Sequence, residues 1–80
     1  MPSLDSPASQ PRDIPIRGDT IRLGQLLKLA GVVGTGGELK ALLEREPVVV
    51  NGEPDARRGR QLHPGDVVVV GGEELRVTVS

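Results

Sequence analysis

The stretch that decides the fold is VVVNGEPDARRGRQLHPGDVVVV, from Val48 to Val70. It begins and ends with β-branched runs, residues 48–50 and 67–70, of the kind that forms buried strands. Asn51-Gly52 predicts a tight turn after the first run, because both residues tolerate a positive φ. Pro64-Gly65-Asp66 predicts another turn before the second run. The stretch therefore predicts two paired strands with a long connection between them.

That connection carries three cations within four positions, Arg57, Arg58 and Arg60. Guanidinium groups bind phosphate through forked, charge-assisted hydrogen bonds. We interpret the segment as a basic loop that a rigid strand pair displays and does not need for its own folding. The alternative is an ordinary solvated loop. Further cations that would extend the patch are Arg22 and Lys28, near a first helix, and Lys40 on a second.

Length and composition limit the classes of function. Eighty residues allow one small domain, and the absence of Cys leaves neither a disulfide framework nor a thiolate metal site. This composition fits a reducing cytoplasm. No apolar run reaches the roughly 20 residues of a membrane span, and the N-terminus has no secretory-signal pattern. The formal net charge of −1 argues against a nucleic-acid partner only if the charges are spread evenly.

The chain contains no Phe, Tyr or Trp. Its core must therefore be aliphatic, and its surface cannot stack bases on aromatic rings, as many single-strand binders do. Any nucleic acid bound here is expected to be held through phosphate, groove shape and hydrogen bonds.

Two short helices are expected before the stretch 48–70 that decides the fold. The first follows from apolar residues at i, i+3, i+4 and i+7, namely Leu23, Leu26, Leu27 and Ala30. Gly24 is a candidate N-cap and Gly31 a candidate left-handed C-terminal cap. The second helix is expected over residues 37–45, and Pro47 ends it.

Residues 1–15 are expected to be a disordered tail, because they hold four prolines and few apolar residues. Ile14 and Ile16 predict a short edge strand that Pro15 interrupts. After the basic loop we expect a short strand near Gln61-Leu62, then a Gly71-Gly72 turn. The last segment, 75–79, alternates apolar and polar residues like a half-buried edge strand.

The predicted fold is α+β, with a helical hairpin packed on a small, mainly antiparallel sheet in one domain, residues 16–80. Gly36 and Gly37 open the second helix, whose amides would attract an anion, although these glycines can equally serve backbone geometry alone. The spacing fails as a phosphate loop, since Gly37 stands where the lysine would be. His63 and Asp66 are interpreted as turn residues. No metal site, cofactor site or catalytic constellation is found, so no enzyme activity is expected.

The runs IRLGQLLKLAGVVGTGGELKALL and VVVNGEPDARRGRQLHPGDVVVV strongly resemble the S-four type RNA-binding domain. That family is named after the fourth protein of the small ribosomal subunit, and its helical hairpin with strands is the αL RNA-binding motif. The resemblance covers about residues 20–80. It is strongest to the small stand-alone bacterial members of the YaaA/YbcJ type.

This resemblance implies that structured RNA, ribosomal or tRNA-like, is held against the helical hairpin and the loop after Val-Asn-Gly. Carried over by position, the RNA-binding residues are Thr35, Gly36, Lys40, Arg57, Arg58 and Arg60. Three departures from the family pattern stand out. Gly24 replaces an Asp at the start of the first helix, Leu39 replaces an Ala, and Glu46-Pro47 stands where many relatives have Gly.

Three functions follow as hypotheses. The first is a monomeric, cytoplasmic, non-enzymatic protein that docks on structured RNA, such as ribosomal RNA or a ribosome-assembly intermediate. The second is a β-grasp sulfur carrier, which needs a C-terminal diglycine; here Gly71-Gly72 is followed by EELRVTVS. The third is a protein-interaction module that uses the valine-rich sheet.

Overall fold

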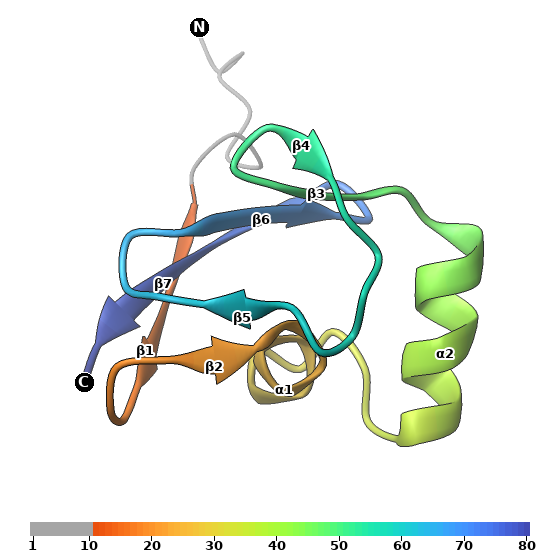
Figure 1. Cartoon of the computed structure of the whole chain (residues 1–80). Helices are drawn as coiled ribbons and strands as arrows, with labels where there is room; N and C mark the ends of the chain where they lie inside the picture. The colour runs from red at the N-terminus through yellow and green to blue at the C-terminus, as the bar shows by residue number, and fades with distance from the viewer. Residues whose placement is uncertain (1–10) are drawn as a thin grey trace, which may run out of the picture.

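The computed structural model describes residues 11–80 and has the predicted α+β architecture (Figure 1). Seven strands and two helices are present in this part of the chain. In chain order they are β1 (Arg12–Ile16), β2 (Ile21–Arg22), α1 (Leu23–Leu29), α2 (Gly36–Arg45), β3 (Val48–Val50), β4 (Glu53–Pro54), β5 (Gln61–Leu62), β6 (Val67–Val70) and β7 (Glu73–Val79).

Five of the strands form one sheet in the order β1-β7-β6-β3-β4. The two valine runs pair antiparallel, with Val49 opposite Val69, which confirms the strand pair predicted from residues 48–70. Among the strands of residues 11–80, only β1 runs parallel to its neighbour, β7. The short strands β2 and β5 pair separately. In Figure 1, α1 lies beneath the strands and α2 stands at one side of them.

The core is entirely aliphatic, as the absence of aromatic residues requires. The predicted face of α1 is buried, and Leu23, Leu26 and Leu27 are fully enclosed. Within residues 11–80, the other buried hydrophobic residues are Ile14, Ile16, Ala30, Val33, Leu39, Val48, Val50, Leu62, Val68, Val70, Leu75 and Val77. Burial of these side chains supplies most of the driving force for folding, since the helices are too short to be stable alone.

Helix α2 is attached to the core mainly through one residue. Leu39 is buried, whereas Leu42 and Leu43 are only partly covered. The helix begins at Gly36, one residue before the predicted start, because the Thr35 hydroxyl accepts a hydrogen bond from the Glu38 amide at 3.1 Å. Such an N-cap satisfies one of the otherwise unpaired first-turn amides.

The turn after β3 has the predicted geometry. Asn51 and Gly52 both have positive φ, 51° and 85°. The Asn51 side chain also ties the two valine strands together: its oxygen accepts from the Val67 amide at 2.9 Å, and its nitrogen donates to Asp66 at 3.1 Å. A non-glycine residue is therefore held in the left-handed region by two side-chain hydrogen bonds.

Several boundaries differ from the sequence predictions. Residues 12–15 belong to β1, so the assignment of residues 1–15 to a disordered tail is wrong there, whereas the edge strand expected at Ile14 and Ile16 is confirmed; residues 1–10 lie outside the described part. Strand β7 is not an edge, because it pairs with both β1 and β6. The N-cap of α1 is Arg22 and not Gly24. The left-handed Gly31 and the strand at 61–62 are confirmed.

Candidate nucleic-acid interface

The arginine loop, residues 55–60, packs against the start of α1. The Leu23 amide donates to the Arg60 carbonyl at 2.8 Å, and the Gly24 amide donates to the Arg58 carbonyl at 2.9 Å. These amides have no partner within the helix, so the loop supplies the acceptors that the helix start lacks. The expectation that folding does not need this loop is therefore wrong: its backbone caps α1.

A single carboxylate, that of Asp55, holds two of the three loop arginines. Arg57 donates to it through Nε at 3.1 Å and Nη2 at 2.9 Å, and the Arg57 backbone amide donates at 3.0 Å. Arg60 donates through Nη1 at 2.6 Å. Hydrogen bonds from Arg57 and Arg60 hold the pKa of the Asp55 carboxyl well below its usual range, and the hydrogen bond to Asp55 raises the pKa of Arg57. Asp55 therefore stays ionised and fixes both side chains.

The third arginine, Arg58, faces a hollow of about 320 Å³ between the loop and the two helices. We call this hollow the α1 groove; it is lined by Arg22, Gly24, Gln25, Lys28, Leu39, Arg58 and Gly59. Three of the lining residues are cations and none is acidic. Within residues 11–80, no hydrogen bond or ion pair occupies the Arg58 guanidinium. The groove thus collects positive charge on a chain whose net charge is slightly negative.

The inner wall of the α1 groove depends on the absence of a side chain at Gly24. A Cβ there would lie 2.8 Å from Cδ2 of Leu39 and 3.4 Å from the carbonyl oxygen of Arg58. Both helices and the arginine loop therefore meet at this glycine. Gly24 and Leu39 are two of the departures from the family pattern, and the structure shows that they are complementary: the larger residue on α2 occupies the space that the glycine leaves on α1.

The predicted α2 residues Thr35, Gly36 and Lys40 are exposed and do not line the α1 groove. The carboxylate of Glu38 already accepts hydrogen bonds from the backbone amides of Gly34, at 2.6 Å, and Thr35, at 3.1 Å. The helix start thus carries its own anion, and these two amides are engaged. Phosphate binding by Thr35 and Gly36 remains a prediction, with less support from this geometry than the arginines have.

A second cationic hollow, of about 560 Å³, is lined by Arg57, Gly59, Arg60, Gln61 and His63. We call it the β5 hollow, since Gln61 begins that strand. His63 Nδ1 lies 3.8 Å from an Asp66 oxygen. Partial burial tends to raise the pKa of Asp66, but a hydrogen bond from the His63 amide and another from Asn51 lower it overall.

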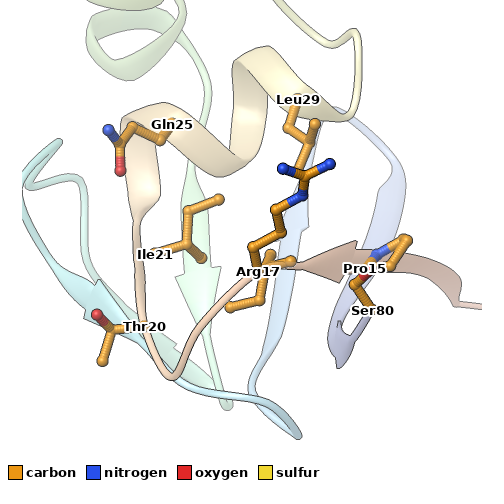
Figure 2. Close-up of a pocket in the computed structure, with 8 residues that line it drawn as sticks. Pro15, Arg17, Thr20, Ile21, Gln25, Leu29 and Ser80 are labelled. Atoms are coloured by element: carbon orange, nitrogen blue, oxygen red, sulfur yellow. The ribbon is translucent and has the colours of Figure 1, made fainter.

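A third hollow, of about 480 Å³, is more apolar (Figure 2). Its lining residues are Pro15, Ile16, Arg17, Thr20, Ile21, Gln25, Leu29 and Ser80. It shares only Gln25 with the α1 groove. With a single cation, Arg17, in its wall, it is a weaker candidate for binding phosphate than the other two.

Residues 11–80 contain no cluster of three or more His, Asp or Glu side chains that would hold a metal ion. In the same range, neither helix has the length and apolar character needed to cross a membrane.

Comparison with known proteins decides the family. The model of the S4 domain matches residues 14–78, which is most of the chain. This protein belongs to the S4 domain family. The resemblance to the S-four type domain is thereby confirmed, and membership in the family supports an RNA-binding role. A probable ribosome maturation protein, RlbA, of Bacillus subtilis (strain 168) is 55% identical over 60 residues, covering 72% of this chain and 84% of the relative.

Sequence reasoning missed two features of this S4 domain. The role of Asp55 escaped notice, although an acid two and five positions before two arginines is a readable signal for a local ion-pair cluster. Gln25 lines two hollows, yet nothing in its sequence context distinguishes it from any exposed helical residue.

Proposed function

We propose that this S4 domain is a non-catalytic, cytoplasmic RNA-binding protein that acts as a monomer and docks structured RNA against the α1 groove. The observation that carries the proposal is the convergence of Arg22, Lys28 and Arg58 on one hollow without a carboxylate. Phosphate diesters are the ligands that such a surface attracts most strongly, because each cation releases condensed counterions from the RNA.

The composition of the groove favours folded RNA over flexible single strands. Neither the groove nor any other part of this chain offers a Phe, Tyr or Trp side chain on which an unpaired base would stack. Recognition must therefore depend on the spacing of phosphates and on groove shape, which folded RNA presents in a fixed arrangement. The related protein is named a probable ribosome maturation protein. This supports ribosomal RNA, or an intermediate of ribosome assembly, as the target.

The test measures the binding of ribosomal RNA fragments to the purified protein by fluorescence anisotropy at several salt concentrations. With about four phosphate contacts, affinity should fall on the order of 10²-fold between 50 and 200 mM salt. Arg58→Ala and Lys28→Ala should each weaken binding, and each should reduce the salt slope by about one unit. The Arg58 substitution leaves in place the backbone carbonyl that caps α1.

A matched control is Arg76→Ala, which removes one cation from β7, outside the groove. Arg76 pairs with Asp13 on the surface at 2.8 Å, so its loss should cost little stability. Equal losses of RNA affinity in Arg76→Ala and Arg58→Ala would mean that binding follows net charge and not the groove. Unchanged binding in Arg58→Ala and Lys28→Ala would contradict the proposed interface.

The two alternative functions have less support. A sulfur carrier needs its diglycine at an accessible chain end, but Gly71-Gly72 forms the turn between β6 and β7, with φ of 57° and 80°. The interaction-module reading predicts partner recovery from cell extracts that survives ribonuclease treatment. Recovery of ribosomal RNA after in-cell crosslinking, with loss of partners on ribonuclease treatment, would favour the RNA-binding proposal.

A further inference from the structure

The β5 hollow is formed in part by the arginine loop and lies outside the proposed interface. Its lining residues are of the kind that bind anions. Arg57, Arg60, Gln61 and His63, whose side chains all carry nitrogen donors, line it, and no acidic residue does. It shares only Gly59 with the α1 groove. The loop thus separates two cationic hollows, one containing Arg58 and the other containing Arg57 and Arg60.

Asp55 determines how much of each guanidinium is left for a ligand. A guanidinium has five N–H groups. Arg57 uses Nε and one hydrogen of Nη2 on Asp55, and Arg60 uses Nη1. Within residues 11–80, Arg57 Nη1 and Arg60 Nε and Nη2 have no acceptor. Donors therefore remain on both side chains after Asp55 has been satisfied.

Asp55 itself is withdrawn from solvent behind the arginines. Its side chain is 9% exposed, whereas that of Arg57 is 76% exposed and that of Arg60 is 27% exposed. The carboxylate therefore lowers the positive charge of the loop by one unit. It also fixes two long side chains, which would otherwise lose considerable rotamer entropy on binding. Ordering such a side chain costs about 0.5–1.5 kcal/mol at an interface, so prior ordering favours the ligand.

We infer that the β5 hollow is a second phosphate-binding site for the RNA, formed by Arg57, Arg60 and His63, and that Asp55 is its positioning residue. The inference rests on the proposed RNA-binding function and extends the contact surface to the other side of the arginine loop. The ligand is a phosphate diester of the same RNA, held by the guanidinium donors that Asp55 does not engage. Gln61 contributes a neutral amide at the rim.

The decisive experiment compares two variants that each remove one acid, Asp55→Asn and Glu53→Gln. Glu53 lies on β4 and is exposed, and its side chain makes no hydrogen bond or ion pair within residues 11–80. Both substitutions raise the net charge by one unit. If only charge mattered, both would strengthen binding to a ribosomal RNA fragment. The positioning role predicts that Glu53→Gln leaves affinity unchanged or slightly higher, whereas Asp55→Asn lowers it about tenfold, the size expected for one lost charged hydrogen bond.

The salt dependence gives a readout that a merely structural role would not change. Loss of one phosphate contact should reduce the slope of log affinity against log salt by about 0.7–0.9. Asp55→Asn keeps an oxygen that can accept from the Arg57 amide, so the loop turn should persist. Circular dichroism and thermal melting check this.

Two further variants cover the case in which Asp55→Asn does not fold, namely Arg57→Ala and His63→Ala. Both side chains are largely exposed. Each variant should bind RNA more weakly than the parent, with Arg57→Ala also reducing the salt slope. Parental affinity in both would overturn the inference, and so would tighter binding by a folded Asp55→Asn protein.

The groove variant Arg58→Ala, measured in the same series, separates this inference from the proposed function. Weaker binding in Arg58→Ala alone would refute the second site and leave the α1 groove as the interface. A parent protein that binds no RNA would refute both.

Discussion

Replacement of Gly24 by Ala tests whether Gly24 and Leu39 are complementary, and its effect should depend on which residue stands at position 39. In the parent, the added Cβ would lie 2.8 Å from Cδ2 of Leu39, closer than real Cβ contacts, and Leu39 is only 1% exposed. Overpacking of this kind costs about 1–3 kcal/mol, and the higher helix propensity of alanine returns up to about 1 kcal/mol. We expect Gly24→Ala to lower the free energy of unfolding by about 1 kcal/mol.

In a Leu39→Ala background the sign of the same substitution should reverse. Leu39→Ala alone should lower the free energy of unfolding by about 2–5 kcal/mol, the usual range for a buried leucine. In the Leu39→Ala background, the Cβ at position 24 would occupy part of the space that the leucine leaves. The higher helix propensity of alanine would then stabilise the protein without the steric overlap that offsets it in the parent. Gly24→Ala should then raise the free energy of unfolding by up to about 1 kcal/mol. The expected coupling between the two sites is therefore about 2 kcal/mol.

Urea unfolding followed by circular dichroism at 222 nm measures all four members of this cycle. If the Gly24→Ala effect is the same in both backgrounds, the two sites are independent and the proposed complementarity is wrong. Arg58 provides an internal check, because its carbonyl would lie 3.4 Å from the new Cβ in either background. A penalty that persists after Leu39→Ala would show that the arginine loop, and not Leu39, resists the substitution.

Three further substitutions or conditions test the fold and its electrostatics. Gly52→Val should lower the free energy of unfolding by about 1 kcal/mol or more, because Gly52 has a φ of 85° that a β-branched residue resists; unchanged urea stability would contradict the turn assignment. Ile16→Ala should lower it by about 2–4 kcal/mol, since Ile16 is 3% exposed in β1, and a neutral result would place β1 outside the core. The pKa values of Asp55 and Asp66 are lowered in the folded state. Their stabilising effect is therefore complete above the unfolded pKa of about 3.9 and is lost as the pH falls below it. The free energy of unfolding measured in urea should decline below about pH 4, and the decline should be smaller in Asp55→Asn; equal declines would contradict the ion-pair role.

Local features of this chain were readable from the sequence because they depend on near neighbours. The valine runs, the positive φ at Gly52 and the periodic face of α1 each reflect steric or packing preferences of a few adjacent residues. The α+β class and the S4 family followed from the order of these elements and from motifs such as Val-Asn-Gly. The trio of loop arginines was also visible as a cluster of charge.

The tertiary structure decided what those arginines do. Asp55 engages Arg57 and Arg60, while Arg58 turns to the α1 groove, so three adjacent cations of the same type have different surroundings. Strand β1 was underestimated because its stability comes from β7, some sixty residues away, and not from its proline-containing sequence.

Taken alone, the sequence determines the two valine strands, the Asn51-Gly52 turn and the two helices of this protein, because those preferences arise within a few bonds of each residue. It does not determine which side chains share a hollow. Lys28 on α1 and Arg58 on the loop line the same groove only because the amides of Leu23 and Gly24 bind the carbonyls of the arginine loop. Those hydrogen bonds join residues more than thirty positions apart, and such long-range pairing is a property of the folded chain.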